Sequence, residues 1–375
     1  MTLSRHPLAR RLSEAWFEAH PSLGEWALLQ ALAPASWVYS AAMRARSLAY
    51  ENGLLEVVRA PIPVVSVGNL IVGGAGKTPV VIELARRLRD AGERVAVLTR
   101  GYGAEREDAR LVADAEGIHL PAREAGDEPL LIARRCEGVI VLAGPDRAAL
   151  AERAAKEHGA TLALLDDGMQ HRRLHRDLEI VVIDASSPLG NGRALPGGPL
   201  REPVTALSRA NLVWLSRTDE LGQRPLTTEA ELQTLLSRLG LPVVRACYRP
   251  VAVSDLQGQD RREAGWLEGR AVHALSGVAR PHSFLQTLTS AGARLTGNSV
   301  FGDHHAFSAE EIGAVLAEAK AEGAMVVTTE KDAQRLGGLA LPPDHGIAVV
   351  VVETEILEGE QLLTRAIAGL PEPTA

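Results

Sequence analysis

The stretch Val64-Val65-Ser66-Val67-Gly68-Asn69-Leu70-Ile71-Val72-Gly73-Gly74-Ala75-Gly76-Lys77-Thr78-Pro79 guides the interpretation of the whole chain. It begins with an apolar β-branched run, continues through a glycine-rich turn and ends in Gly-Lys-Thr at the start of a helical pattern. Glycines let backbone N–H groups close around phosphate oxygens, a lysine reaches the β- and γ-phosphates, and a threonine hydroxyl binds Mg²⁺. The order of strand, Gly-Lys-Thr and helix therefore predicts a phosphate-binding loop.

The residues expected to contact the nucleotide follow from this loop. They are Ile71, Val72, Gly73, Gly74, Ala75, Gly76, Lys77 and Thr78. The strict spacing of such loops has a glycine where this chain has Ile71, and a plain glycine-rich turn is the alternative interpretation. Only four of the 40 basic residues are lysines, so a lysine inside the loop indicates that a compact point charge is needed there.

Two adjacent carboxylates end another apolar strand. Ala163-Leu164-Leu165 leads directly into Asp166 and Asp167, which are followed by a glycine. In open α/β sheets, ligands bind at the carboxyl ends of the strands, so this pair should face the loop. We expect one of the two aspartates, together with Thr78, to bind Mg²⁺, and the sequence does not assign the ion to either one. A strand-ending turn without a metal is the alternative.

Strands and helices alternate along most of the chain. This alternation, with apolar strands, predicts an α/β fold with a doubly wound, mainly parallel sheet of the P-loop NTPase-like type. At 375 residues the chain is long for one core, and the pattern restarts near residue 250 without a second phosphate loop. We predict N-terminal interfacial helices over residues 1–55, a phosphate-loop domain over 56–245 and a smaller C-terminal α/β domain over 246–375.

The N-terminal segment has an unusual composition. It holds six of the thirteen aromatic residues within fifty positions, and no charged residue lies between Trp26 and Met43. Pro34 should divide this segment into two helices, the second ending at Asn52-Gly53. Its polar residues argue against a membrane-spanning helix, whereas aromatics followed by Arg44 and Arg46 suit a helix in the bilayer interface. An amphipathic arm packed on the main domain is the alternative.

Charge and cysteine content limit the possible partners. A net charge of −7 gives no overall attraction to nucleic acid, so we expect no nucleic-acid partner, and an anionic substrate must be met by local arginines. Two widely separated cysteines in no metal-ligand spacing indicate a reducing compartment, which favours the cytoplasm.

Further polar residues fit phosphoryl transfer, in which positioning, charge neutralisation and a base near the acceptor hydroxyl must be supplied. Asp127 is the candidate base because it lies at the junction before a helix rather than on a solvated face. His304, within Asp303-His304-His305, could orient Asp127 or share its proton. Asp303 is the second candidate base.

Seven segments, in order along most of the chain, resemble the tetraacyldisaccharide 4'-kinases of lipid A biosynthesis, a family of the P-loop superfamily associated with the bacterial inner membrane. They are Gly68-Asn69 with Gly73-Gly74-Ala75-Gly76-Lys77-Thr78-Pro79, Arg100-Gly101-Tyr102-Gly103, Gly126-Asp127-Glu128-Pro129, Asp166-Asp167-Gly168-Met169-Gln170-His171, Pro199-Leu200-Arg201-Glu202, Phe301-Gly302-Asp303-His304-His305 and Thr329-Glu330-Lys331-Asp332. The family's usual loop also lacks the first glycine. Met169 stands where the family most often has an aromatic.

The resemblance implies transfer of the ATP γ-phosphate to the 4'-hydroxyl of a tetraacylated glucosamine disaccharide 1-phosphate, which gives lipid IVA. It implies ATP and Mg²⁺ as cofactors, and a peripheral enzyme on the cytoplasmic face of the inner membrane, attached by its N-terminal helices. The implied catalytic residues are Asp127, His304 and Lys77. Gln170, His171, Arg147 and Arg201 become candidates for nucleotide or headgroup contacts. Whether His304 or His305 partners Asp127 stays open.

Two other functions compete with this one. A membrane-bound ATPase switch, similar to the division-site positioning ATPases, would hydrolyse ATP without transferring a group. Those proteins carry a lysine just before the loop glycines, where this chain has Val72. A soluble small-molecule kinase would leave the aromatic N-terminus unexplained.

Overall fold

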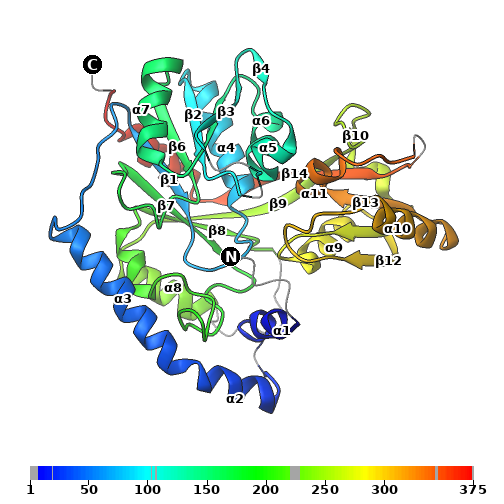
Figure 1. Cartoon of the computed structure of the whole chain (residues 1–375), viewed down its shortest axis with the longest axis horizontal. Helices are drawn as coiled ribbons and strands as arrows, with labels where there is room; N and C mark the ends of the chain where they lie inside the picture. The colour runs from blue at the N-terminus through cyan, green and yellow to red at the C-terminus, as the bar shows by residue number, and fades with distance from the viewer. Residues whose placement is uncertain are drawn as a thin grey trace. The chain divides into compact units, whose positions relative to one another are not determined.

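The computed structural model describes residues 7–18, 20–102, 104–105, 108–219, 229–342 and 345–373. The chain forms two compact units. Figure 1 labels helices and strands of both. Unit 1 comprises Met1–Arg100, Asp146–Cys247 and Ile356–Ala375, and unit 2 comprises Gly101–Pro145 and Tyr248–Glu355. Two of the four boundaries fall within strands, β9 (Val243–Ser254) and β14 (Ala348–Glu358). The division predicted at residues 55 and 245 stays a prediction.

The sheet of unit 1 is parallel throughout. Its strands lie in the order β9-β8-β7-β1-β6-β2. Their bounds are β1 (Val64–Gly68), β2 (Val95–Thr99), β6 (Leu162–Asp166), β7 (Leu178–Asp184) and β8 (Leu212–Ser216). Every residue of these five strands is buried, as expected for parallel strands that are covered on both faces.

Helices α4 (Lys77–Asp90) and α7 (Arg147–His158) pack on β6 and β2. Helix α4 begins directly after the glycine turn, in which Gly73 and Gly76 have φ values of 102° and 80°, a backbone conformation that favours glycine. Helix α8 (Glu229–Arg238) packs through Leu232 and Leu236 against β8. Helix α12 (Glu360–Ala368) completes the unit. The predicted strand, glycine turn and helix are therefore confirmed in this order.

Three helices precede this sheet in the chain: α1 (Pro7–Ala15), α2 (Leu23–Ala31) and α3 (Ala33–Glu51). Ser22 and Glu25 form a capping box at the start of α2, and Pro34 lies in the first turn of α3, where its missing N–H costs no hydrogen bond. Asn52 ends α3. Division of the segment at Pro34 and its end at Asn52 are confirmed. No helix among the described residues is long and apolar enough to span a membrane.

Unit 2 contains a second parallel group of strands, in the order β12-β11-β13-β14. Its elements are β11 (Ala271–Ser276), α9 (Pro281–Ser290), β12 (Arg294–Val300), α10 (Ala309–Ala321), β13 (Met325–Thr329) and α11 (Glu330–Leu336). Side chains alternate along β11: Val272 and Ala274 pack with α9, whereas Leu275 packs with α10. Helices therefore cover both faces of these strands.

A second part of unit 2 is antiparallel. Strand β3 (Arg110–Asp114) pairs with β4 (Gly117–Ile118) and with β5 (Ile140–Ala143). Helices α5 (Ala122–Ala125) and α6 (Asp127–Arg135) follow β4, and the short β10 (Arg262–Glu263) pairs with β9. The predicted α/β fold with a mainly parallel sheet is confirmed.

Candidate functional site

Lys77 is the first residue of α4, and its side chain folds back onto unit 1. Its Nζ atom lies 3.1 Å from Asp167 Oδ1 and 3.2 Å from Asn69 Oδ1. The side chain is 14% exposed, so Lys77 is mostly buried and paired, and not the exposed loop lysine that a glycine-rich turn suggests. Asn69 is fully buried and also donates from Nδ2 to the carbonyl oxygen of Ile71, which fixes its side chain.

The predicted nucleotide-binding residues divide into two groups. The side chains of Ile71 and Ala75 lie in the core of unit 1, and the amide of Val72 donates to the carbonyl oxygen of Pro199 at 2.8 Å. Gly73 is exposed, and Gly74, Gly76, Lys77 and Thr78 are half-buried. The second group is the part of the loop that solvent reaches.

Asp167 is held by two cations. Arg201 donates from one nitrogen to both Asp167 oxygens, at 2.9 and 2.8 Å, and Lys77 contacts the same carboxylate. Although burial alone would raise the pKa of Asp167, Lys77 and Arg201 hold it well below its ordinary value. The backbone φ of Asp167 is 56°, in the left-handed region. Asp166 is also buried, and pairs through its backbone with Val67 at the end of β1. Both aspartates thus lie in unit 1 with the loop.

Gln170, His171 and Arg147 lie on the same unit. Gln170 donates from Nε2 to the Asn69 carbonyl oxygen at 3.0 Å and accepts from Arg201 at 3.2 Å, so its amide links the loop to Arg201. Burial, followed by the nearby Arg147, lowers the pKa of His171 to about 4, and its Nε2 atom has no hydrogen-bond partner among the described residues. The imidazole of His171 is therefore neutral at physiological pH.

A second polar cluster lies in unit 2. Asp127, the first residue of α6, is 5% exposed and lies 3.0 Å from His304, between Oδ2 and Nδ1. His305 instead contacts Glu311 at 3.0 Å and stacks on Phe301. The structure therefore pairs Asp127 with His304 and not with His305. The backbone φ of His304 is 57°, again in the left-handed region.

Lys331 fixes the hydrogen-bonding state of His304. Its Nζ atom lies 3.0 Å from His304 Nε2, 3.0 Å from Glu128 Oε1 and 3.5 Å from Asp303 Oδ1. Because an ammonium group only donates, His304 accepts at Nε2 and donates from Nδ1 to Asp127. In this arrangement the imidazole is neutral and has no lone pair left for a substrate proton.

The charges of this cluster shift one another's pKa values. The hydrogen bond that His304 donates to Asp127 raises the pKa of His304 above its ordinary value, against the effect of burial. Burial would raise the pKa of Asp127, but the hydrogen bond from His304 and the charge of Lys331 lower it. Burial would lower the pKa of Lys331, but Glu128 and Asp303 raise it. Asp127 is thus a carboxylate at neutral pH.

Four residues of these clusters were given no role from the sequence: Glu128 and Lys331, which were quoted only within motifs, and Asn69 and Arg335. Asn69 appeared only as part of the loop motif, although it holds Lys77. Arg335 was missed: its Nε atom lies 3.6 Å from Asp127 Oδ2 and its guanidinium donates to the carbonyl oxygen of Gly277. Spacing could have found Arg335, because it lies four residues after Lys331 and so on the same side of α11. Gly103, quoted in one sequence motif, lies outside the described residues.

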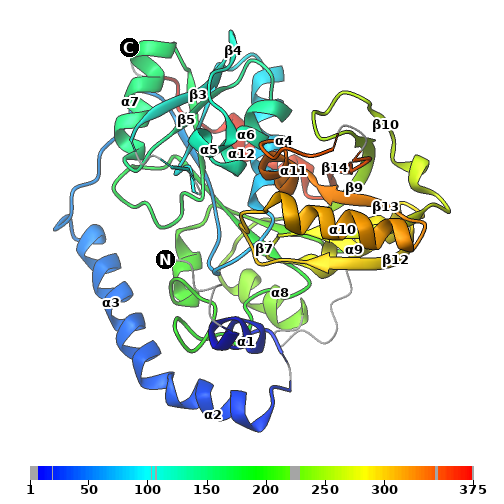
Figure 2. The same cartoon turned by 45° about the vertical axis from the view of Figure 1, so that its right-hand side comes forward.

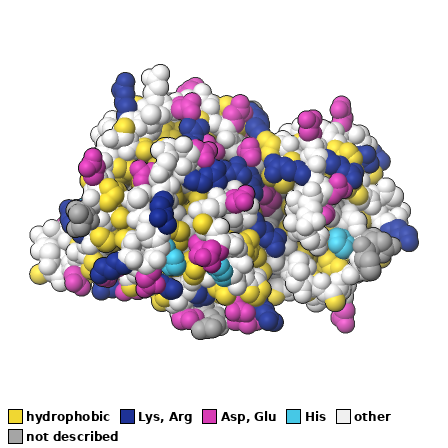
Figure 3. All heavy atoms as spheres, turned by 90° about the horizontal axis from the view of Figure 1, so that it is seen from above, with side chains coloured by type: hydrophobic (Ala, Val, Ile, Leu, Met, Phe, Trp, Pro, Cys, Tyr) yellow, Lys and Arg dark blue, Asp and Glu magenta, His cyan; other side chains and the backbone are white. Residues whose placement is uncertain are grey.

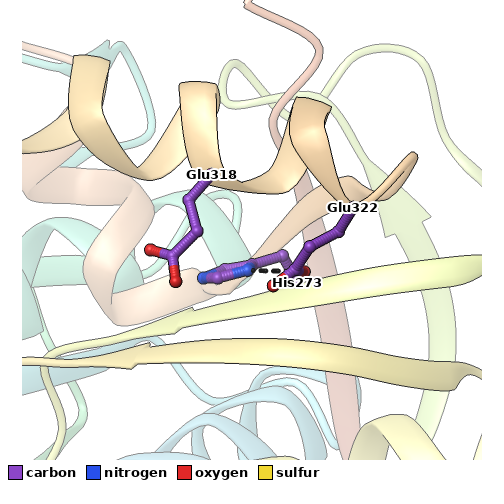
Figure 4. A group of neighbouring side chains, drawn as sticks. All are labelled: His273, Glu318 and Glu322. Atoms are coloured by element: carbon purple, nitrogen blue, oxygen red, sulfur yellow. Dashed lines mark hydrogen bonds and ion pairs between the residues drawn. The ribbon is translucent and has the colours of Figure 1, made fainter.

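A third group of ionisable residues in unit 2 stands apart from this cluster. His273 of β11 is fully buried and faces Glu318 and Glu322 of α10 (Figure 4). Its Nδ1 atom contacts Glu322 at 3.1 Å, and its Nε2 atom contacts the Ser299 hydroxyl at 2.9 Å. Both ring nitrogens are therefore satisfied by protein groups. Helix α10 itself packs on the sheet through Ile312, Val315 and Ala319.

Comparison with known proteins agrees with these features. The family model described as tetraacyldisaccharide-1-P 4'-kinase matches residues 28–370. A tetraacyldisaccharide 4'-kinase of Anaeromyxobacter sp. (strain K) is 49% identical over 96% of this chain and 97% of its own length. One from Syntrophotalea carbinolica is 41% identical over 92% of this chain and 94% of its own length. The crystal structure of LpxK from Aquifex aeolicus in complex with ATP superposes with a TM-score of 0.73 at 30% identity, covering 91% of this chain and 98% of that one.

The matched range includes both polar clusters and the mainly parallel α/β sheet. The chain belongs to the tetraacyldisaccharide-1-P 4'-kinase family. The family predicted from the seven sequence segments is confirmed.

Proposed function

We propose that this chain is an ATP-dependent lipid kinase that transfers the γ-phosphate of ATP to the 4'-hydroxyl of tetraacyldisaccharide 1-phosphate, giving lipid IVA in lipid A biosynthesis. The observation that carries the proposal is the family match over residues 28–370, which includes both polar clusters. The structural relative crystallised in complex with ATP supports ATP as the phosphoryl donor.

The loop of unit 1 would hold the triphosphate. Gly73, Gly74, Gly76, Lys77 and Thr78 form its solvent-reached part, at the positive end of α4. In the structure Lys77 is paired with Asp167, which Arg201 also neutralises. An incoming phosphate would therefore draw Lys77 from a carboxylate that keeps a second cation, so that no buried charge is left without a partner.

The donor set near the loop fits Mg²⁺, which binds to carboxylate and hydroxyl oxygens and neutralises the charge of the transferred phosphoryl group. Arg201 donates to both oxygens of Asp167, which also pairs with Lys77. Either Asp166 or Asp167 would supply the carboxylate, and Thr78 would supply the hydroxyl.

Asp127 would accept the proton of the acceptor hydroxyl. It is ionised, whereas His304 has both ring nitrogens engaged, which leaves Asp127 as the base of the pair. His304 would orient the carboxylate through Nδ1–H and stabilise it. Lys331 would hold the tautomer of His304 through Nε2 and is in turn held by Glu128.

The N-terminal helices would attach the enzyme peripherally to the cytoplasmic face of the bacterial inner membrane. Leu23, Trp26, Trp37 and Val38 of α2 and α3 are large apolar side chains that are more than half exposed. Exposed apolar side chains of this kind suit insertion into the bilayer interface. Leu29 does not belong to this face, because it is 5% exposed and packs against Trp16. We define the membrane face as Leu23, Trp26, Trp37 and Val38.

Charge gives no support for a nucleic-acid partner. The net charge is −7, and on the face in Figure 3 the basic side chains lie among acidic and hydrophobic ones. A nucleic-acid backbone requires a concentrated basic surface.

One assay separates the three functions considered. The protein is incubated with γ-labelled ATP, Mg²⁺ and detergent-dispersed tetraacyldisaccharide 1-phosphate, and the label is followed. We expect label in the lipid. Label released only as inorganic phosphate would instead indicate an ATPase switch, and label in an added water-soluble sugar but not in lipid would indicate a soluble kinase.

A further inference from the structure

Helix α3 carries exposed apolar side chains and also side chains that form hydrogen bonds with the rest of unit 1. Trp37 and Val38 belong to the membrane face, whereas Tyr39 and Arg46 reach into unit 1. Tyr39 donates from its hydroxyl to the carbonyl oxygen of Arg201 at 2.9 Å. Arg46 donates to the carbonyl oxygen of Gln170 at 3.0 Å. Figures 1 and 2 show α3 as a long helix on the outside of unit 1, following α2.

The two carbonyl groups belong to residues whose side chains hold the loop. The Arg201 guanidinium binds Asp167, and the Gln170 amide donates to the carbonyl oxygen of Asn69. Asp167 and Asn69 are the two residues that contact the Nζ atom of Lys77. Each hydrogen bond from α3 is therefore connected to Lys77 through two intervening residues.

Packing supports the same connection. The ring of Tyr39 packs against the core cluster of unit 1 that contains Leu70, Ile71 and Ala75, which belong to the loop itself. The backbone of Arg201 also donates to the carbonyl oxygen of Leu70 at 2.7 Å. Tyr39 thus bonds to the segment that supports the loop and packs on the core cluster to which the loop residues belong.

From this geometry we infer that Tyr39 and Arg46 are positioning residues for the phosphate-binding loop, through Arg201 and Gln170. The inference rests on the proposed role of Lys77 in binding ATP. Helix α3 then has a function besides membrane attachment: it orders the residues that place the charge of Lys77. One hydrogen bond of this kind contributes about 0.5–1.5 kcal/mol net, so loss of either should weaken ATP binding by about twofold to tenfold.

The test measures the dissociation constant of Mg·ATP directly, by titration of the full-length protein in detergent, so that it does not depend on phosphoryl transfer. Tyr39→Phe removes only the hydroxyl, and we expect about twofold to tenfold weaker ATP binding with at most a small decrease in melting temperature. Tyr50→Phe is the matched control on the same helix, because Tyr50 uses its ring under Arg46 and Arg172. Arg46→Gln should weaken ATP binding similarly, and Arg46→Lys, which keeps one donor, should recover part of it.

A double-mutant cycle shows whether Tyr39 acts through Arg201. In an Arg201→Met background the guanidinium is absent, so Tyr39→Phe should weaken ATP binding by less than twofold further. Equal ATP affinity in wild type and Tyr39→Phe, or fully additive effects with Arg201→Met, would overturn the inference. If the wild type binds ATP but labels no lipid, the proposed kinase function fails and the inference stands. If the wild type binds no ATP, both fail.

Discussion

The two polar clusters hold their charges in opposite ways. In unit 1, Asp167 lies between Lys77 and Arg201, and its pKa is held so low that it stays ionised at any physiological pH. In unit 2, Asp127 is paired with His304, whose pKa this carboxylate raises above its ordinary value. A phosphate-binding cluster needs a constant charge, whereas a proton acceptor needs a partner that responds to protons. The difference matches the two proposed roles, and it can be tested by substitution in each cluster.

The largest effect is expected at Asp127. Asp127→Ala should lower kcat by about 10²–10⁴-fold, with a much smaller rise in KM for ATP, because a general base acts in the transition state. Steady-state kinetics with lipid in detergent measure both constants. Asp303→Asn is the matched control. A larger kcat loss in that variant than in Asp127→Ala would move the base to Asp303, and a loss confined to KM for ATP would place Asp127 in metal or nucleotide binding.

Lys77→Ala should remove a charge that the transition state needs and lower kcat/KM for ATP by about 10²–10³-fold. The melting temperature should stay close to wild type because Arg201 still neutralises Asp167. Lys156→Ala is the matched control: Lys156 is an exposed lysine on α7 that pairs with Glu152. Kinetics and thermal melting are measured on both variants. Normal turnover by Lys77→Ala would remove the loop from the mechanism.

The membrane face should matter less than either cluster. Replacing Leu23, Trp26 and Trp37 with serine should shift the protein to the soluble fraction and lower activity on vesicle-bound lipid by roughly tenfold or more, with unchanged slow ATP hydrolysis in the absence of lipid. High salt should release wild type only partly, and detergent should release it fully. The control replaces Ile118 and Leu357, which are exposed apolar residues that do not belong to the N-terminal helices. A triple mutant that stays membrane-bound would refute the assignment of this face.

The smallest effect concerns pH. Because Asp127 raises the pKa of His304, the protonated imidazole persists above pH 6.5, its ordinary value. Protonation removes the acceptor that Lys331 uses and weakens Asp127 as a base, so kcat/KM for the lipid should rise with pH through the raised pKa. Asp303→Asn removes a carboxylate that favours the charged imidazole and should move this limb to lower pH. The measurement is the pH–rate profile of both proteins. If the limb lies at the same pH in Asp303→Asn and in wild type, His304 is not the group that titrates.

The sequence predicted the strand, the glycine turn and the helix that begins at Lys77 because each depends on local patterns. Met169, which stands where the family most often has an aromatic residue, is fully buried. A Cβ added to Gly68 would lie only 2.4 Å from the Cβ of Met169. By contrast, the contact between Asp127 and His304 joins residues 177 positions apart, and no local pattern encodes it. The chemistry of the two residue types suggested that pairing, and the choice between His304 and His305 stayed open until the structure paired His304 with Asp127.

Other features could not be predicted for the same reason. The pairing of Lys77 with Asp167, the burial of Leu29 and the grouping of residues 101–145 with unit 2 all depend on tertiary packing. The edge strand β12 was missed because its sequence, Arg294–Val300, is mostly polar, and only its pairing with β11 makes it a strand.

Asp167 and His304 share one backbone feature, a left-handed φ that costs a side chain about 1 kcal/mol or more. Glycine at either position would relieve that cost and remove the functional side chain at once. Directed evolution that selects only for heat resistance would therefore favour glycine at these two positions, and these variants would be inactive. Libraries for this protein should hold both codons fixed.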